Sequence, residues 1–263
     1  MDICLKIAQE LNIRKGQVEA AVQLIDEGNT IPFISRYRKE VTGALNDEQL
    51  RELHERLQYL RNLEEKKEQV LGSIEEQGML TEELRDKILA AETLVMVEDL
   101  YRPYRPKRKT RASVAKEKGL QPLADYVLAQ TAAEDVLTEA AKYLSAEEGK
   151  EVASPEEALQ GAKDIIAEQI SDEADYRGYI RDITMEEGSI SSSAKEEGAE
   201  SVYEMYYNFS EKLSTLPGHR ILALNRGENE KMLTVKIQAP EERILRYLET
   251  KVIVKDNPNT NDY

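Results

Sequence analysis

The chain has 263 residues and a net charge of −15, and its 33% charged and 40% hydrophobic residues are typical of a folded, soluble protein. Its apolar runs are only a few residues long and Asp2, Lys6 and Glu10 interrupt the N-terminus, which excludes a membrane span and a signal peptide and predicts a cytoplasmic protein without membrane contacts. One cysteine and two histidines permit no internal disulfide and leave little for a zinc site, so we expect no metal and no cofactor.

Residues 1–45 predict a unit of three short helices. Apolar residues recur at helical spacing over 3–11 and again over 18–25, which predicts a helical hairpin, and Pro32 begins a third helix. Because three such helices can pack around a tight turn, we assign these residues to a helix-turn-helix-like unit.

The third of these helices carries two kinds of side chain. We expect Phe33, Ile34 and Tyr37 to form its core face, packed against the first two helices. The other face carries the cations Arg36, Arg38 and Lys39. These three side chains are candidate contacts for the phosphates of a nucleic acid.

Residues 46–131 predict one long helix, several short ones and a basic loop. From Asp47, which can cap the helix, to about Gln77, leucines recur at three- and four-residue steps, so we expect a single helix of roughly 45 Å. The pattern drifts at Glu64 and Lys67, which favours a spine within the fold over a coiled-coil seam. Shorter helices are expected over 81–91, 93–100, 113–118 and 122–130.

Residues 132–263 predict an acidic helical region that leads into further domains. Helices are expected over 134–144, 155–170, 173–187, 200–214 and 241–248, a helix or strand over 219–224, a turn or edge strand over 188–194, and a short strand near 232–238. Ser154 and Pro155 give the clearest helix start, and the aromatic residues of 200–214 are expected in the core. The tail 256–262 has no apolar side chain with which to complete a domain.

Motifs for catalysis are absent from the sequence. It contains no P-loop, no dinucleotide-binding glycine pattern, no G-x-S-x-G and no H-E-x-x-H. Ser113 and Lys116 match S-x-x-K, but no partner motif follows and Ser113 is better placed as a helix cap. We therefore expect no catalytic residue and no enzyme activity.

A basic loop at residues 102–111 carries six cations beside two tyrosines. The candidate nucleic-acid contacts in and next to it are Tyr101, Arg102, Tyr104, Arg105, Lys107, Arg108, Lys109 and Arg111. Pro103 and Pro106 favour extended backbone at the residues before them, which predicts a polyproline path with the four arginines on one edge. Guanidinium groups beside flat rings suit phosphates and unstacked bases.

Two other interpretations of the basic loop stay open. Residues 134–204 hold 6 basic and 20 acidic side chains, a net charge of −14, so almost all the acidity lies in one segment and a basic surface elsewhere is not excluded. The loop cations could pair with this acidic segment or with a partner protein, and the tyrosines would then be packing residues. The loop could also be no more than solvated.

Residues 30–43, TIPFISRYRKEVTG, resemble the N-terminal region of the bacterial Tex family, the transcription accessory proteins. Further matches follow in the same order at 47–51, 57–61, 73–78, 98–101 with the basic loop behind it, and 218–227. Together they extend over nearly the whole chain. The resemblance is loosest between residues 131 and 200.

The resemblance implies a long helical scaffold with a helix-turn-helix-like unit, followed in the family by a degenerate RNase H-like domain, paired helix-hairpin-helix motifs and an S1 domain. It also implies nucleic-acid binding in support of transcription. The sequence ends before the last three parts, so we expect a truncated N-terminal region and carry over no catalytic residue.

We predict a mostly α fold in which a long spine helix supports shorter helices, with minor strands. As function we expect a non-catalytic scaffold module of a transcription accessory protein, which contacts RNA or DNA weakly and without sequence preference through the basic loop. The alternative is a protein-interaction scaffold that docks RNA polymerase, other transcription proteins or the further domains without touching nucleic acid.

Overall fold

The computed structural model describes residues 1–196 and 201–263 and confirms a mostly α-helical fold with a few short strands. The chain divides into two compact units, Met1–Tyr104 (unit 1) and Arg105–Tyr263 (unit 2). This boundary falls within the basic loop, and the predicted boundaries near 45 and 131 stay predictions. In the described part of the chain, no helix is long and apolar enough to cross a membrane.

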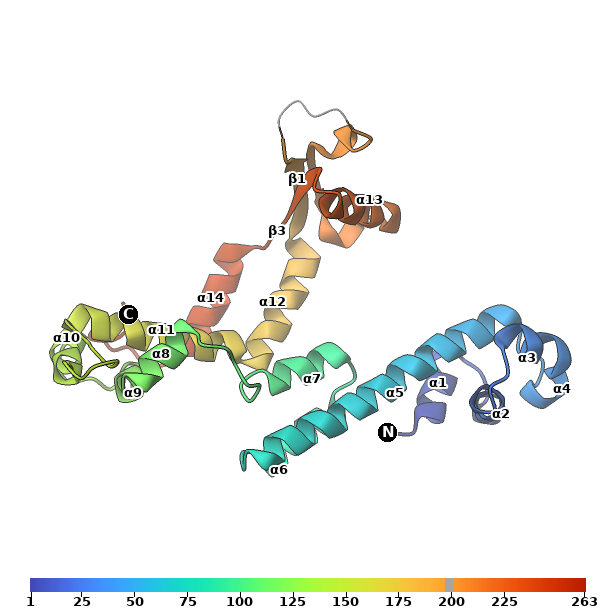
Figure 1. The fold of residues 1–263 in the computed structure, drawn as a ribbon, viewed down its shortest axis with the longest axis horizontal. Helices are drawn as coiled ribbons and strands as arrows, with labels where there is room; N and C mark the ends of the chain where they lie inside the picture. The colour runs from blue at the N-terminus through green and yellow to red at the C-terminus, as the bar shows by residue number, and fades with distance from the viewer. Residues whose placement is uncertain (197–200) are drawn as a thin grey trace. The chain divides into compact units, whose positions relative to one another are not determined.

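Unit 1 is built on one long helix. Its elements are α1 (Ile3–Glu10), α2 (Lys15–Asp26), α3 (Ile31–Tyr37), α4 (Lys39–Thr42), α5 (Asp47–Glu76), α6 (Glu82–Ala90) and α7 (Leu94–Tyr101). Figure 1 shows α1 to α4 beside the N-terminal half of α5, and α6 and α7 beside its C-terminal half. The predicted hairpin, third helix, spine and shorter helices are confirmed, whereas the helix-turn-helix arrangement stays a prediction.

α5 buries one row of side chains along its length. Leu50, Leu53, Leu57, Leu60, Leu63, Val70 and Ile74 are at most 2% exposed. Asn46, not the predicted Asp47, caps the helix, because its side chain accepts from the Gln49 backbone N–H at 2.8 Å and the Gln49 side chain reaches back to Asn46 at 3.1 Å. Lys67 is also buried. Its ammonium group donates a hydrogen bond to the Leu89 carbonyl at 2.8 Å, at the C-terminal end of α6.

α3 turns a different edge inward from the one predicted. Ile34 is fully buried, and Ile31, three residues earlier on the same edge, packs against the same core. Phe33 is 36% exposed and Tyr37 is 62% exposed, so the prediction that both rings belong to the core is wrong. A helix of seven residues that packs on α5 along its isoleucine edge leaves the neighbouring ring edge outside.

Unit 2 contains a second helical core and a small sheet. Its elements are α8 (Arg111–Glu117), α9 (Gln121–Ala129), α10 (Val136–Ala140), η1 (Ala141–Tyr143), α11 (Pro155–Asp172), α12 (Ala174–Glu187), β1 (Ser189–Ala194), η2 (Glu204–Tyr206), β2 (Asn208–Lys212), η3 (Leu213–Thr215), α13 (Gly218–Asn229), β3 (Leu233–Gln238) and α14 (Glu241–Val252). Helices α8 to α11 enclose the core. Ser154 caps α11 and Pro155 opens it, as predicted.

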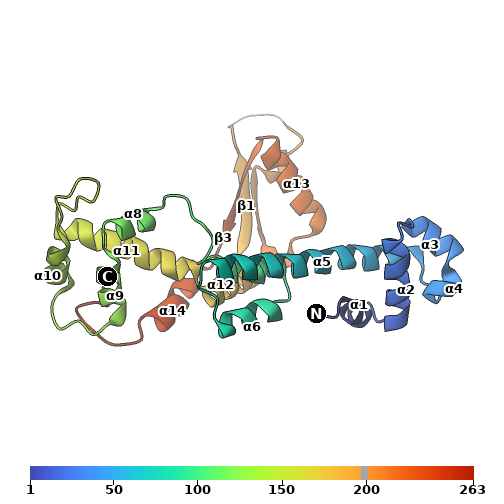
Figure 2. The ribbon, with the colours of Figure 1, turned by 60° about the horizontal axis from the view of Figure 1, so that its bottom comes forward.

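The sheet is antiparallel with the strand order β2-β1-β3. Ile190 of β1 lies opposite Glu211 on one side and Ile237 on the other. β1 is therefore the central strand, and the prediction of a turn or edge strand over 188–194 is wrong in its placement. Figure 2 shows α13 beside the sheet. Residues 219–224, for which either a helix or a strand was predicted, belong to this helix.

The prediction of a helix over 200–214 is wrong for residues 201–214, and residue 200 lies outside the described residues. η2, β2 and η3 occupy this segment. Within β2, the half-buried side chains of Phe209 and Glu211 alternate with exposed neighbours, which is the period of a strand. Tyr203 and Tyr206 are nevertheless buried, which confirms their place in the core.

The C-terminal tail is tied to the end of α9 by hydrogen bonds. The Gln130 side chain donates to the Val252 carbonyl at 2.6 Å and accepts from the backbone N–H of Val254 at 2.9 Å. Asn257 and Asn259 each donate to the Ala132 carbonyl at 3.1 Å. Polar side chains with specific backbone partners thus replace the apolar contacts that the tail lacks.

Truncating one side chain on each edge of α3 should show which edge is buried. Ile34→Ala should destabilise the chain by about 2–5 kcal/mol, because it opens a cavity at a fully buried position. Phe33→Ala should cost well below the roughly 3–5 kcal/mol of a buried phenylalanine, since the ring is partly exposed. Urea unfolding followed by circular dichroism measures both losses. A larger loss for Phe33→Ala than for Ile34→Ala would contradict this arrangement.

Adding a methyl group at two helical glycines should have opposite effects. A Cβ at Gly161 of α11 would lie 2.4 Å from Leu120 Cδ1, so Gly161→Ala should cost about 1–3 kcal/mol through overpacking. Gly178 of α12 has no atom within 4 Å of that position, and Gly178→Ala should stabilise the chain by about 0.4–1 kcal/mol. Thermal unfolding of the two variants is the measurement, and a neutral Gly161→Ala would show that α11 does not pack this closely.

Candidate nucleic-acid interface

The predicted contacts lie on two separate surfaces. Arg36 lies on α3, Arg38 between α3 and α4, and Lys39 on α4, all in unit 1. Together with Phe33 and Tyr37 they form what we call the α3–α4 surface. The basic loop crosses the boundary between the units, so that Tyr101, Arg102 and Tyr104 belong to unit 1 and Arg105, Lys107, Arg108, Lys109 and Arg111 to unit 2.

The first part of the basic loop is folded onto unit 1. Arg102 has helical backbone angles, φ −53° and ψ −42°, and a turn follows in which the Tyr104 N–H donates to the Tyr101 carbonyl at 2.9 Å. Arg111 is the first residue of α8, so the predicted polyproline path with four arginines on one edge is wrong at both ends. The rings of Tyr101 and Tyr104 pack against the core of unit 1, and the Tyr101 hydroxyl lies 3.0 Å from Ser73 Oγ. These contacts favour the packing interpretation for both tyrosines.

The second part of the basic loop pairs with the acidic segment. Lys107 forms ion pairs with Asp172 and, at 3.4 Å, with Glu168 of α11. Arg111 Nε lies 3.7 Å from an oxygen of Asp164. Asp164, Glu168 and Asp172 recur every four residues on one face of α11, where they are largely buried. Intramolecular pairing is therefore confirmed for two of the loop cations.

Arg108 and Lys109 differ from these two residues. Both side chains are exposed, and no carboxylate of the described residues lies within ion-pair distance of either. Arg108 and Lys109 can therefore bind an external anion without the loss of an internal ion pair.

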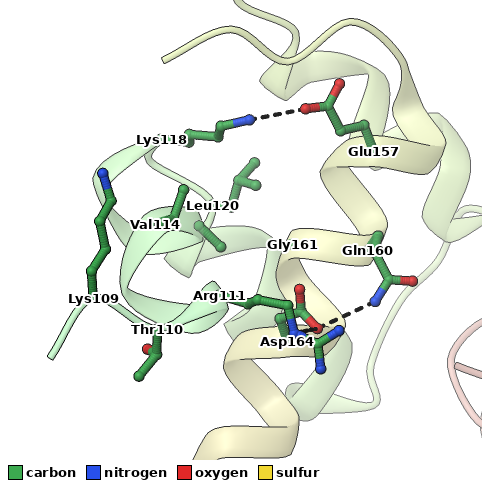
Figure 3. Close-up of a pocket in the computed structure, with 11 residues that line it drawn as sticks. Lys109, Thr110, Arg111, Val114, Lys118, Leu120, Glu157, Gln160, Gly161 and Asp164 are labelled. Carbon is green, nitrogen blue, oxygen red and sulfur yellow. Dashed lines mark hydrogen bonds and ion pairs between the residues drawn. The ribbon is translucent and has the colours of Figure 1, made fainter. Parts of the chain in front are cut away.

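A cavity of about 390 Å³ lies between α8 and α11, next to the loop. Figure 3 shows Lys118 and Glu157 pointing toward one another on one side, 2.9 Å apart, and Arg111 beside Asp164 on the other. Val114, Leu120 and Gly161 also line the cavity. These charges are neutralised in pairs and part of the wall is apolar, so Lys109 is the one lining cation without a carboxylate partner among the described residues. Ser113 is not the cap of α8 as predicted, since Thr110 takes that role.

The α3–α4 surface combines exposed rings with exposed cations. The ring centroids of Phe33 and Tyr37 are 5.4 Å apart, and the Arg38 guanidinium lies 5.4 Å from the centroid of Phe33. Arg36, Arg38 and Lys39 are exposed, and none is within ion-pair distance of a carboxylate in the described part of the chain. The sequence predicted the cations as contacts and placed the rings in the core, and only exposed rings beside Arg36 and Arg38 would have indicated a contact surface.

Contacts with α2 hold the α3–α4 surface in place. Arg38 breaks the helical path between α3 and α4 with φ −131° and ψ 26°, and its carbonyl accepts from Thr42 Oγ1 at 3.2 Å. The Gln17 side chain of α2 donates to the carbonyls of Thr42 and Gly43 at 3.2 and 2.9 Å. Gly43 has φ 61°, and a Cβ there would lie 2.8 Å from Gln17 Nε2, so this turn requires glycine.

Comparison with known proteins gives consistent matches. Residues 1–75 match the family model of the Tex-like protein N-terminal domain, and residues 131–259 match the Tex central region-like model. The chain is 45% identical over 241 residues to the transcriptional accessory protein Tex of Neisseria gonorrhoeae, which covers 90% of this chain and 31% of that protein. It is 47% identical over 251 residues to the uncharacterized protein YdcI of Bacillus subtilis, covering 94% of this chain and 35% of that protein.

A more distant relative is human. The chain is 29% identical over 245 residues to the S1 RNA-binding domain-containing protein 1 of Homo sapiens, covering 90% of this chain and 24% of that protein. It thus spans about a third or less of the length of the relatives named here. The two model matches and the identities of about 45% confirm the resemblance seen in the sequence, and the chain belongs to the Tex family.

Proposed function

We propose that the chain is a non-catalytic module of a transcription accessory protein that contacts the phosphates of nucleic acid. One relative is named a transcriptional accessory protein and another an S1 RNA-binding domain-containing protein. The observation that carries the proposal is the α3–α4 surface, where Arg36, Arg38 and Lys39 are exposed and have no carboxylate partner among the described residues. A phosphate can bind such cations without first breaking an internal ion pair.

The basic loop supplies a second, smaller set of contacts. Arg108 and Lys109 have the same unpaired, exposed character as the α3–α4 cations. Lys107 is held by two carboxylates of α11, so we assign it to the fold and not to the interface. Arg111 lies 3.7 Å from Asp164, but its side chain is 86% exposed, so it stays a candidate phosphate contact. The loop therefore contributes fewer phosphate contacts than its six cations suggest.

Binding through these cations should be weak. A body with a net charge of −15 repels a polyanion at long range, and only a few cations are available to offset this repulsion. We expect a dissociation constant in the non-specific range of roughly 10⁻⁴ to 10⁻⁶ M near physiological salt. No sequence preference is expected, because neither surface resembles a set of side chains that reads base edges.

A protein-interaction scaffold is the alternative, and one observation favours it. An open cavity of about 700 Å³ is formed by α11, α12, η3, β3 and α14, and its apolar lining includes Ile170, Tyr176, Ile180, Met185, Leu213 and Ile237. Met185 is 55% exposed and Ile237 is 63% exposed. Apolar surface of this kind is typical of protein contacts, and RNA polymerase or another transcription protein would then be the partner.

The salt dependence of binding distinguishes the two proposals. Replacing Arg36, Arg38 and Lys39 by alanine should flatten the slope of log K against log salt by about 2.7 on duplex DNA, because up to three phosphate contacts are lost. Arg108→Ala with Lys109→Ala should flatten it by about 1.8. Fluorescence anisotropy with labelled single- and double-stranded DNA and RNA gives the slopes.

A matched variant separates binding from folding. Lys107→Ala should leave the slope unchanged but lower the melting temperature, because Asp172 and Glu168 lose a cation in a largely buried place. Unchanged slopes in both sets of surface variants would contradict phosphate contact and support the protein-interaction scaffold.

A further inference from the structure

We propose that Phe33 and Tyr37 form a stacking site for the unpaired bases of a nucleic-acid strand. This inference rests on the proposed function, because it assumes that the cations around the rings contact phosphates. It goes beyond that function in assigning a site for bases, whereas the cations alone would take any polyanion.

The position of the rings is the first argument. Tyr37, 62% exposed, and Phe33, 36% exposed, lie one helical turn apart with their centroids at 5.4 Å and their planes at 45°. Val41, on the next short helix, adds a third exposed apolar side chain, at 48%. Exposed rings held at an angle to one another can each accept a flat group, and a base stacks on a ring whatever its sequence.

The charge around the rings is the second argument. Arg36, Arg38 and Lys39 are sequence neighbours of the two rings, and they have no carboxylate partner in the described part of the chain. The Arg38 guanidinium already lies against the face of Phe33, 5.4 Å from its centroid. Rings beside cations match the alternation of bases and phosphates along a single strand, whereas the paired bases of a duplex leave no face open to a ring.

The rigidity of the backbone is the third argument. Ile34 is fully buried below the rings, and Gln17 fixes the turn after α4 through two hydrogen bonds to carbonyl oxygens. α3 is thereby held at its centre, and the turn after α4 is fixed to α2, before any ligand arrives. A strand that binds there meets rings whose backbone is already ordered, so less conformational entropy is lost on binding.

Two strands that differ only in their bases test the site. A labelled single-stranded oligonucleotide and an abasic strand of equal length carry the same phosphates, so stacking contributes only to the first. Tyr37→Leu and Phe33→Leu keep apolar bulk but lose the flat ring. Each should weaken binding of the base-containing strand by roughly tenfold in fluorescence anisotropy, and leave the abasic strand and the salt slope unchanged.

Three control variants accompany the test. Tyr37→Phe keeps the ring and should bind like the wild-type chain. Arg36→Gln with Lys39→Gln should weaken both strands equally, because it removes charge alone. Tyr263→Leu removes another partly exposed tyrosine with a cation, Lys163, over its ring, and it should change neither strand. Unchanged melting temperatures in the leucine variants show that the fold is intact.

The outcomes separate this inference from the proposed function. If the wild-type chain binds both strands equally and the leucine variants do the same, the stacking site is overturned while phosphate contact stands, and the rings are left to a protein partner. If the wild-type chain binds neither strand, both proposals fail. A loss confined to the base-containing strand supports the site.

Discussion

Burial of the leucine row on α5 is the interaction on which unit 1 depends. The helices α1, α2, α3, α6 and α7, which pack on α5, have between seven and twelve residues, and helices this short are not stable alone in water. Each exists because it covers part of a row that would otherwise face solvent. The α3–α4 surface is a consequence of this packing, because α3 gives its isoleucine edge to the core and is left with its ring edge outside.

α11 organises unit 2 with a different balance of forces. Ala158, Ala162 and Ile165 of this helix are fully buried in the apolar core, while Asp164, Glu168 and Asp172 face the basic loop and α8. Removing one partner of a largely buried pair leaves a charge that water cannot reach, and this costs more than the intact pair gives. Part of the acidity of the chain is therefore used to hold the loop, and the loop cations nearest to α11 are tied to the fold.

Local signals predicted most of the fold, and contacts distant in sequence decided the rest. Ser154 with Pro155 and the leucine spacing of α5 act within a few residues, so the helix start and the spine were predictable. Lys67 pairs with Glu64 on its own helix but also donates to the Leu89 carbonyl, 22 residues away, and Lys107 meets Asp172 across 65 residues. No local pattern reveals which cation of a basic loop is paired. The exposed rings of α3 were missed for the same reason, since burial is decided by the element on which a helix packs.

The exposed, unpaired cations and the paired Lys107 respond differently to salt. At physiological ionic strength charges more than about 8 Å apart are screened, and the exposed cations of the α3–α4 surface lose attraction for a polyanion as salt rises. Lys107 is screened less, because Asp172 and Glu168 hold it at contact distance on a largely buried face. A ring contact is not ionic, so its share of any binding at Phe33 and Tyr37 persists where the phosphate contacts weaken. High salt should thus leave the fold of the loop intact, and it should shift nucleic-acid contact from the cations of unit 1 toward its exposed rings.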